Sequence, residues 1–229
     1  MSSRMATALV PMKAHSERLP NKNVKEFAGR PLFHWIMEAL VASERVDEIV
    51  VNTDSERIAR EAEARFGATV LWRPDHLLGD MVGIQPLIEW DLQHSHSQLY
   101  LQTHSTNPLL RPETIDRAIA AFCDQEYHDS LFTVTKLYTR LYYMDGRPVN
   151  HDPEELMRTQ DLDPILEENS CVYVFPRSTF EQRGHRLGER PLLMDISPLE
   201  ALDIDESHDF VIAETLMQRR LAAEAGEPA

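Results

Sequence analysis

The sequence predicts an α/β fold in which a mostly parallel sheet is covered by helices on both faces, giving three layers. Short apolar runs alternate with segments whose apolar residues recur at helical spacing. The chain has 229 residues, of which 42% are hydrophobic and 27% charged, so it can bury one large core. We therefore expect a single domain over residues 1–229.

Seven apolar runs predict the strands of this sheet. Each run is short and ends at prolines or polar turn residues, as is typical of buried strands. In chain order they are "ATALVP" at 6–11, "DEIVVNTD" at 47–54, "ATVLWRP" at 68–74, "QLYLQT" at 98–103, "SLFTVTKL" at 130–137, "SCVYVF" at 170–175 and "PLLMDI" at 191–196.

Five segments between and after these runs have helical periodicity. The first follows Pro31, since proline is favoured in a first helical turn, and the second has Asp54 or Ser55 as its cap and Gly67 as its end. The other three are Met81–Leu92, Pro112–Cys123 and Ser207–Leu221. Strands that alternate with helices in this way predict parallel pairing.

Residues 138–168 interrupt the alternation. They contain turn signals such as Asp145-Gly146 and several prolines, but no long period. We expect an inserted hairpin or lobe here.

The charge distribution restricts the partners. A formal net charge of -15 argues against binding to DNA, RNA or anionic membranes, because all of them would be repelled. Residues 11–30 are a local exception, with five basic residues against two acidic ones, or +3, which leaves -18 for the rest.

This basic segment directly follows the first strand, where ligands of open α/β sheets bind. Its side chains and backbone donors can hold a triphosphate, although a solvated surface loop is the alternative. The segment lacks the glycines of a Walker loop or a dinucleotide fingerprint.

Cysteine content and hydropathy indicate a cytoplasmic protein. Cys123 and Cys171 are expected to be buried thiols, and no uninterrupted apolar run of about 18 residues occurs.

The basic segment also resembles a known family. Lys13, Ser16, Arg18, Leu19, Pro20, Lys22 and Asn23 are similar to the N-terminal signature of the acylneuraminate cytidylyltransferases, the CMP-sialic acid synthetase-like family. The likeness continues through "VVNTD" at 50–54, "RP" at 73–74, "LQTHSTNPLL" at 101–110, "ENSCVYVF" at 168–175 and "DIDESHDF" at 203–210.

The resemblance implies a Rossmann-like, GT-A-like nucleotidyltransferase. It implies that CMP passes from CTP to a sugar acid, a nonulosonate or related keto-sugar, with release of pyrophosphate. Magnesium as cofactor and a homodimer formed through the inserted lobe are implied in the same way.

The resemblance also assigns roles to individual residues. It implies catalytic roles for Lys13, Arg18, Lys22 and Asp205, and nucleotide contacts for Lys13, Ser16, Arg18, Lys22, Asn23, Arg73 and Asp80. Acceptor contacts are expected from Gln102, His104, Arg158, Gln160 and Asn169, and metal ligation from Asp203 and Asp205. His104 is a candidate for acceptor contact or proton transfer, with a backbone-bonded loop histidine as the alternative.

The acidic pair has a rationale of its own. If "LDID" at 202–205 ends a strand, residues two apart point to one face and present two carboxylates to one hard cation. Alternatively, Asp205 or Ser207 caps the last helix.

Three departures from the family pattern leave the acceptor open. Glu17 stands where many sialate enzymes have lysine, Glu168 stands where they often have arginine, and "QTHSTNP" at 102–108 is two residues longer than usual. A phosphonate or phosphorylated metabolite is therefore an alternative acceptor, and a nucleotide-sugar-binding protein without turnover is an alternative function. A glycosyltransferase is disfavoured because its Asp-x-Asp would follow a middle strand.

Overall fold

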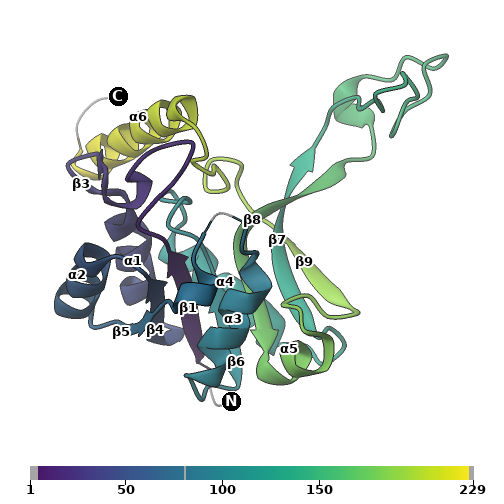
Figure 1. The fold of residues 1–229 in the computed structure, drawn as a ribbon. Coiled ribbons are helices and arrows are strands. Elements are labelled where there is room, and N and C mark those ends of the chain that lie inside the picture. The colour runs from purple at the N-terminus through teal and green to yellow at the C-terminus, as the bar shows by residue number, and fades with distance from the viewer. Residues whose placement is uncertain (1–4, 80, 227–229) are drawn as a thin grey trace.

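The computed structural model of the chain describes residues 5–79 and 81–226. In this part of the chain the predicted strands form one seven-stranded sheet in the order β5-β4-β1-β6-β8-β7-β9 (Figure 1). Strand β8 runs antiparallel to β6 and β7, whereas the other neighbouring pairs are parallel. The bounds are β1 Ala6–Met12, β4 Val46–Thr53, β5 Thr69–Trp72, β6 Leu99–Gln102, β7 Ser130–Leu137, β8 Ile165–Pro176 and β9 Pro191–Asp195.

The predicted helices are present, together with shorter elements that periodicity did not reveal. The predicted helices are α1 Leu32–Ala42, α2 Glu56–Phe66, α3 Ile84–Gln93, α4 Pro112–Cys123 and α6 Ser207–Glu224. The short helix α5 Arg177–Arg183 was not predicted. The short elements are a hairpin of β2 Glu26–Phe27 and β3 Arg30–Pro31, and the 3-10 turns η1 Lys22–Val24, η2 Asp75–Leu77 and η3 Thr159–Asp161.

Two of the predicted helix starts need comment. Helix α3 begins at Ile84 and not at Met81, because Gly83 has extended dihedral angles and is a poor helix former. Helix α2 is capped by Ser55, whose hydroxyl accepts a hydrogen bond from the Ile58 amide. Asp54 is then left to accept a 2.6 Å hydrogen bond from the Ala14 amide in the basic loop.

The two faces of the sheet bury different helices. Side chains alternate along β1, so Ala8 and Val10 contact the core made with α1, α2 and α4, whereas Leu9 contacts the core on the opposite face. That second core contains Ile88 of α3 and Phe180 of α5. The expected three-layer arrangement is thus confirmed.

Helix α6 packs against the end of the basic loop. Phe210 and Met217 of α6 join Phe27 and Trp35 in a separate buried cluster that also contains Leu19. The rings of Phe27 and Phe210 meet edge to face at 5.2 Å. This contact brings the C-terminal part of the chain beside residues 13–24.

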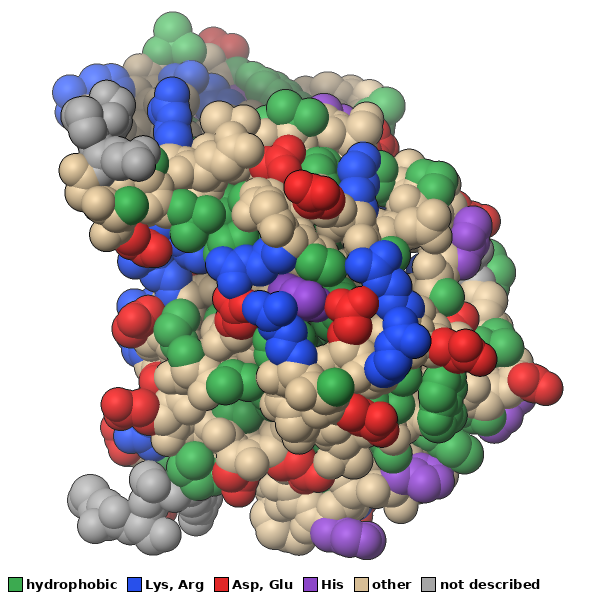
Figure 2. Space-filling view, turned by 90° about the vertical axis from the view of Figure 1, so that its left-hand side faces the viewer, with side chains coloured by type: hydrophobic (Ala, Val, Ile, Leu, Met, Phe, Trp, Pro, Cys, Tyr) green, Lys and Arg blue, Asp and Glu red, His purple; other side chains and the backbone are tan. Residues whose placement is uncertain are grey.

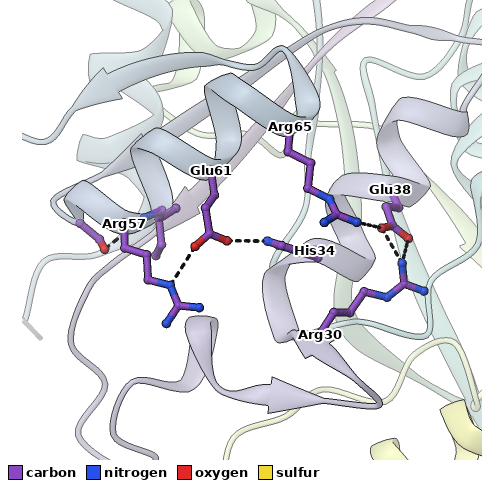
Figure 3. Close-up of polar contacts among 8 residues, drawn as sticks. Arg30, His34, Glu38, Arg57, Glu61 and Arg65 are labelled. Carbon is purple, nitrogen blue, oxygen red and sulfur yellow. Dashed lines mark hydrogen bonds and ion pairs between the residues drawn. The ribbon is translucent and has the colours of Figure 1, made fainter.

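An ionic network joins α1 and α2 (Figure 3). It borders this cluster, because the Arg30 guanidinium lies 3.5 Å from the centre of the Trp35 ring. Nε2 of His34 lies 2.7 Å from Glu61, which also accepts a 2.9 Å hydrogen bond from Arg57. Glu38 is contacted by Arg30 and by Arg65, the latter at 3.3 Å. His34 is buried, and burial lowers its pKa, so the network holds the helices together with a neutral imidazole at neutral pH.

Residues 138–164 form an arm that projects from the sheet (Figure 1). Strands β7 and β8 stay paired up to Leu137 and Ile165, so the last residues of the predicted segment 138–168 belong to a strand. The large apolar side chains exposed on the arm are Tyr138, Tyr142, Tyr143, Met144, Val149, Leu156 and Met157.

Two smaller expectations can be compared with the structure. Cys171 is a buried thiol, but Cys123 is only half-buried, and neither forms a disulfide. Within residues 5–79 and 81–226, every helix is too short or too polar to cross a bilayer.

Candidate functional site

A pocket of about 490 Å³ lies at the carboxyl edge of the parallel strands. Its walls come from the loops that follow β1, β5 and β6, from the loop that precedes α6, and from residues of α3 and β8. The structure brings the following predicted residues together in it: Lys13, Ser16, Arg18, Lys22, Asn23, Arg73, His104, Asp203 and Asp205.

Asn23 braces the basic loop from inside. Its Nδ2 donates a 2.8 Å hydrogen bond to the carbonyl of Lys13, and its Oδ1 accepts one of 2.7 Å from Ser105. The side chain is buried, so both bonds are shielded from water. Asn23, predicted as a nucleotide contact, therefore holds the two ends of the loop together and ties them to the loop after β6.

Lys22 links this loop to the segment before α6. Its Nζ donates a 2.5 Å hydrogen bond to the carbonyl of Ile204 and lies 3.7 Å from Oδ1 of Asp205. The amide of Ile204 in turn donates to the carbonyl of Thr106 at 2.9 Å. Burial lowers the pKa of Lys22, while the carboxylates of Asp205 and Asp203 counteract that effect. The ammonium is thus fixed at the pocket wall.

Asp205 faces the pocket and does not cap α6. Its Oδ1 lies 3.0 Å from the guanidinium of Arg18. The helix is capped by Glu206, whose amide donates to the carboxylate of Asp209 at 2.8 Å in a capping box. The capping alternative for Asp205 and Ser207 is therefore wrong, and the Asp205 carboxylate is available to the site.

Asp203 lies deeper in the same wall. Thr106 hydrogen-bonds to its carboxylate, but the other oxygen, Oδ1, is buried without a hydrogen-bond partner. Burial, and then the charge of Asp205, raises the pKa of Asp203. A buried carboxylate with an unpaired oxygen beside a second carboxylate matches the oxygen ligands that Mg²⁺ prefers.

The expected geometry of this pair needs correction. Residues 202–205 form an irregular loop and not the end of a strand, because the Ile204 backbone bonds to Thr106 and Lys22 rather than to a neighbouring strand. The described residues contain no group of three or more His, Cys, Asp or Glu side chains able to hold a metal. A cation here would have two protein carboxylates and ligands from elsewhere.

Arg73 is held from behind by two buried residues. Its Nε donates a 2.9 Å hydrogen bond to Oδ1 of Asn52, and Nδ2 of Asn52 donates one of 2.6 Å to Asp91. Asp91 is almost fully buried, and burial raises its pKa to about 7. The guanidinium is thus positioned at the pocket wall by a buried chain on β4 and α3.

The pocket combines charge with an apolar wall. Its basic side chains are Lys13, Arg18, Lys22 and Arg73 and its acidic ones Glu17, Asp203 and Asp205, so four minus three gives +1 in a chain of net charge -15. Leu77, Val82, Ile84 and Leu87 supply a wall able to cover a planar ring. On the face that Figure 2 shows, acidic and basic side chains are interspersed.

Four predicted acceptor residues lie outside the pocket wall. Gln102 is fully buried, and Asn169 is buried and bonded to Thr133 at 2.6 Å. Arg158 and Gln160 lie in the arm, where Arg158 pairs with Asp161. Asp80, predicted as a nucleotide contact, lies outside the described residues. The roles assigned to these five residues stay predictions.

The sequence reasoning missed Thr106, Ser105 and Ser170 in the pocket wall. Ser170 has a φ of 58°, which is unusual for a residue other than glycine, and it lies where β8 slips register against β7. Register slips of this kind leave no periodic signal in a sequence.

The sheet is covered on both faces, and one pocket at its edge combines a cationic loop after the first strand with apolar side chains. These features place this protein among the nucleotide-binding α/β proteins. Comparison with known proteins identifies a smaller class, a single family. The chain belongs to the cytidylyltransferase family, whose model matches residues 7–227.

Curated relatives point the same way. The chain is 29% identical over 225 residues to N-acylneuraminate cytidylyltransferase A of Danio rerio, covering 95% of this chain and 52% of that protein. It is 29% identical over 232 residues to CMP-N,N'-diacetyllegionaminic acid synthase of Legionella pneumophila, covering 92% and 95%. The chain thus spans about half the length of the fish relative and nearly all of the bacterial one.

Solved structures share the fold. A structure of CMP:2-keto-3-deoxy-manno-octonic acid synthetase complexed with CTP matches with a TM-score of 0.70 at 14% identity, over 94% of this chain and 99% of that one. The 4-diphosphocytidyl-2C-methyl-D-erythritol synthase of Anaerococcus prevotii matches with a TM-score of 0.68 at 13% identity, over 95% and 97%.

Proposed function

We propose that this protein transfers CMP from CTP to a sugar acid and releases pyrophosphate. The observation that carries the proposal is that Lys22 and Arg18 of the early basic loop meet Asp205 of the late acidic segment in one pocket. Family membership and the names of the curated relatives support the same reaction.

The side chains of the pocket would bind different parts of the two substrates. Lys13, Arg18 and Lys22 would bind the triphosphate and stabilise the charge that develops on the departing pyrophosphate. Arg73 and the apolar wall around Leu77 and Leu87 would hold the ribose and the base. The acceptor would lie beside His104 and Ser170, with its hydroxyl in line with the α-phosphorus.

Asp203 and Asp205 are the residues that would hold Mg²⁺. The unpaired buried Oδ1 of Asp203 supports this assignment. When bound, the ion neutralises phosphate charge. Either carboxylate can accept the proton of the acceptor hydroxyl.

Pyrophosphate release tests the proposal. The full chain is incubated with CTP, MgCl₂ and, in separate reactions, N-acetylneuraminate, 3-deoxy-manno-octulosonate and a small phosphonate. We expect turnover with a keto-sugar acid and none with CTP alone. Turnover with the phosphonate only would show that the acceptor class is wrong, and CTP binding without turnover of any acceptor would favour a nucleotide-binding protein.

We also propose that the arm pairs with a second copy of the chain. Seven large apolar side chains are exposed on it, among them Met144 and Leu156, which are 105% and 84% accessible. In a monomer this apolar surface is in contact with water, which is unfavourable in free energy. Packing against an identical arm would bury it. The cytoplasmic location expected from the sequence stays a prediction.

A further inference from the structure

Arg186 lies directly behind the acceptor side of the pocket. It follows the short helix α5, and its guanidinium carbon lies 3.4 Å from the centre of the Tyr173 ring. Tyr173 is fully buried and its hydroxyl bonds to Ser170, a residue of the pocket wall, at 3.2 Å. Stacking on a fixed ring holds the guanidinium in one place.

From this place Arg186 determines the orientation of a buried amide. One of its nitrogens donates to Oε1 of Gln102. Nε2 of Gln102 donates to the carbonyl of Thr103 at 3.0 Å. A guanidinium can only donate and a carbonyl can only accept, so both contacts require the same orientation of the Gln102 amide.

The amide orientation in turn determines where the proton of His104 lies. Nε2 of Gln102 is 3.0 Å from Nε2 of His104. Because the amide nitrogen is a donor, Nε2 of His104 must be the acceptor, and a neutral ring then carries its proton on Nδ1. Burial, with the positive charges of Arg186 and Lys22, lowers the pKa of His104 to about 4, so the ring is neutral near pH 7.

We propose that Arg186 and Gln102 are positioning residues that hold His104 as a neutral imidazole, with its Nδ1–H as a hydrogen-bond donor to an oxygen of the bound acceptor. His104 lines the pocket, and with Nε2 occupied by Gln102 the nitrogen that a ligand can reach is Nδ1. His104 therefore orients the acceptor and does not remove its proton. Only the identity of the ligand oxygen rests on the proposed function.

The tautomer is measured on the ligand-free full chain by ¹⁵N NMR of labelled histidines at pH 7.5, with His104→Asn identifying the His104 signals among the ten histidines. We expect a neutral ring protonated on Nδ1. Gln102→Glu replaces the donor facing Nε2 by an acceptor, so the proton should move to Nε2. The matched control Gln98→Glu makes the same change at an exposed position beside β6 and should leave the tautomer unchanged.

Arg186→Met gives a second, independent variant should Gln102→Glu not fold. Without the guanidinium only the Thr103 carbonyl holds the Gln102 amide, so the flipped amide should become populated, and we expect the second tautomer of His104 to appear beside the first. A wild-type ring that is charged at pH 7.5 or protonated on Nε2 would overturn the proposal, as would an unchanged tautomer in both variants.

Kinetics separates orientation from base catalysis. His104→Ala removes the donor and should raise the acceptor KM about tenfold with kcat changed less than threefold, whereas His104→Asn places an amide N–H near Nδ1 and should restore KM. Loss of kcat in both variants would identify a base and contradict the proposal. Absence of turnover with any acceptor would count against the proposed function alone, because the tautomer is measured without substrate.

Discussion

Nζ of Lys22 donates a 2.5 Å hydrogen bond to the carbonyl oxygen of Ile204, across 182 positions of the chain. The amide of Ile204 bonds to Thr106, so one residue joins the loops that follow β1 and β6. The carboxylates of Asp203 and Asp205 flank this junction on either side in sequence. The cationic loop that contains Lys22 and the acidic pair of Asp203 and Asp205 therefore form one structural unit.

Replacing Lys22 by methionine should disable the site. The variant loses the charge nearest Asp205 and the bond to Ile204, and we expect kcat/KM for CTP to fall about 10²- to 10³-fold, as when a preorganised charge-stabilising donor is lost. Pyrophosphate release measures the effect. The control Arg183→Gln, an exposed arginine of α5, should keep wild-type kinetics. Full activity of Lys22→Met would contradict the assignment.

Asp203→Asn should raise the melting temperature of the metal-free protein and reduce the stabilisation that CTP and MgCl₂ provide. The raised pKa means that the folded state holds this proton to higher pH than the unfolded state, so the carboxyl lowers stability as the pH rises above its usual pKa. At pH 8 without metal, the variant should melt at a higher temperature than the wild type. With CTP and MgCl₂ the wild type should gain more stability than the variant, which keeps the basic residues for CTP but lacks one carboxylate for the cation; differential scanning fluorimetry detects the difference. An equal gain in both proteins would exclude Asp203 as a ligand.

Asp91→Asn should remove a pH-dependent loss of stability. The folded-state pKa is about 7, about three units above the usual value, so the folded protein binds more protons and the wild type loses stability between about pH 4 and pH 7. With a shift of about three units at about 1.4 kcal/mol per unit, the penalty above pH 7 is on the order of 4 kcal/mol. Asparagine at position 91 still has an oxygen that can accept the hydrogen bond from Asn52, and it carries no charge.

Urea unfolding at pH 5 and pH 8 measures this difference. We expect Asp91→Asn to be more stable than the wild type at pH 8, and by a smaller margin at pH 5. Asp47→Asn changes an exposed carboxyl of β4 and serves as control. Parallel pH profiles for the wild type and Asp91→Asn would show that Asp91 is ionised throughout, as the charge of Arg73 favours.

Polar substitutions on the arm should dissociate the proposed dimer. Met144→Ser with Leu156→Ser removes the two most exposed large apolar side chains of the arm, and sedimentation velocity should then show a monomer. Leu199→Ser changes an exposed leucine outside the arm and should leave the dimer intact. A wild-type chain that sediments as a monomer would remove the basis of this proposal.

Much of the fold could be predicted because its signals are local. Alternating or continuous apolar runs predicted the strands, and Ser55 with Gly67 delimited α2 through capping bonds made within a few residues. Boundaries were wrong where a loop lines the pocket: α3 begins after Gly83, and residues 202–205 stay irregular because Ile204 bonds to two other loops. Such bonds depend on distant segments.

The sequence alone determined that this chain is an α/β protein with positive charge after its first strand and two carboxylates before its last helix. Tertiary structure alone decided that these groups face one pocket, that Asn169 turns to Thr133 and that Arg186 reaches Gln102. The physical reason is the distance in sequence over which each interaction acts. Helical periodicity and caps act over a few residues, whereas the hydrogen bonds that orient Lys22, Arg73 and Gln102 join residues brought together only when the sheet and its covering helices pack.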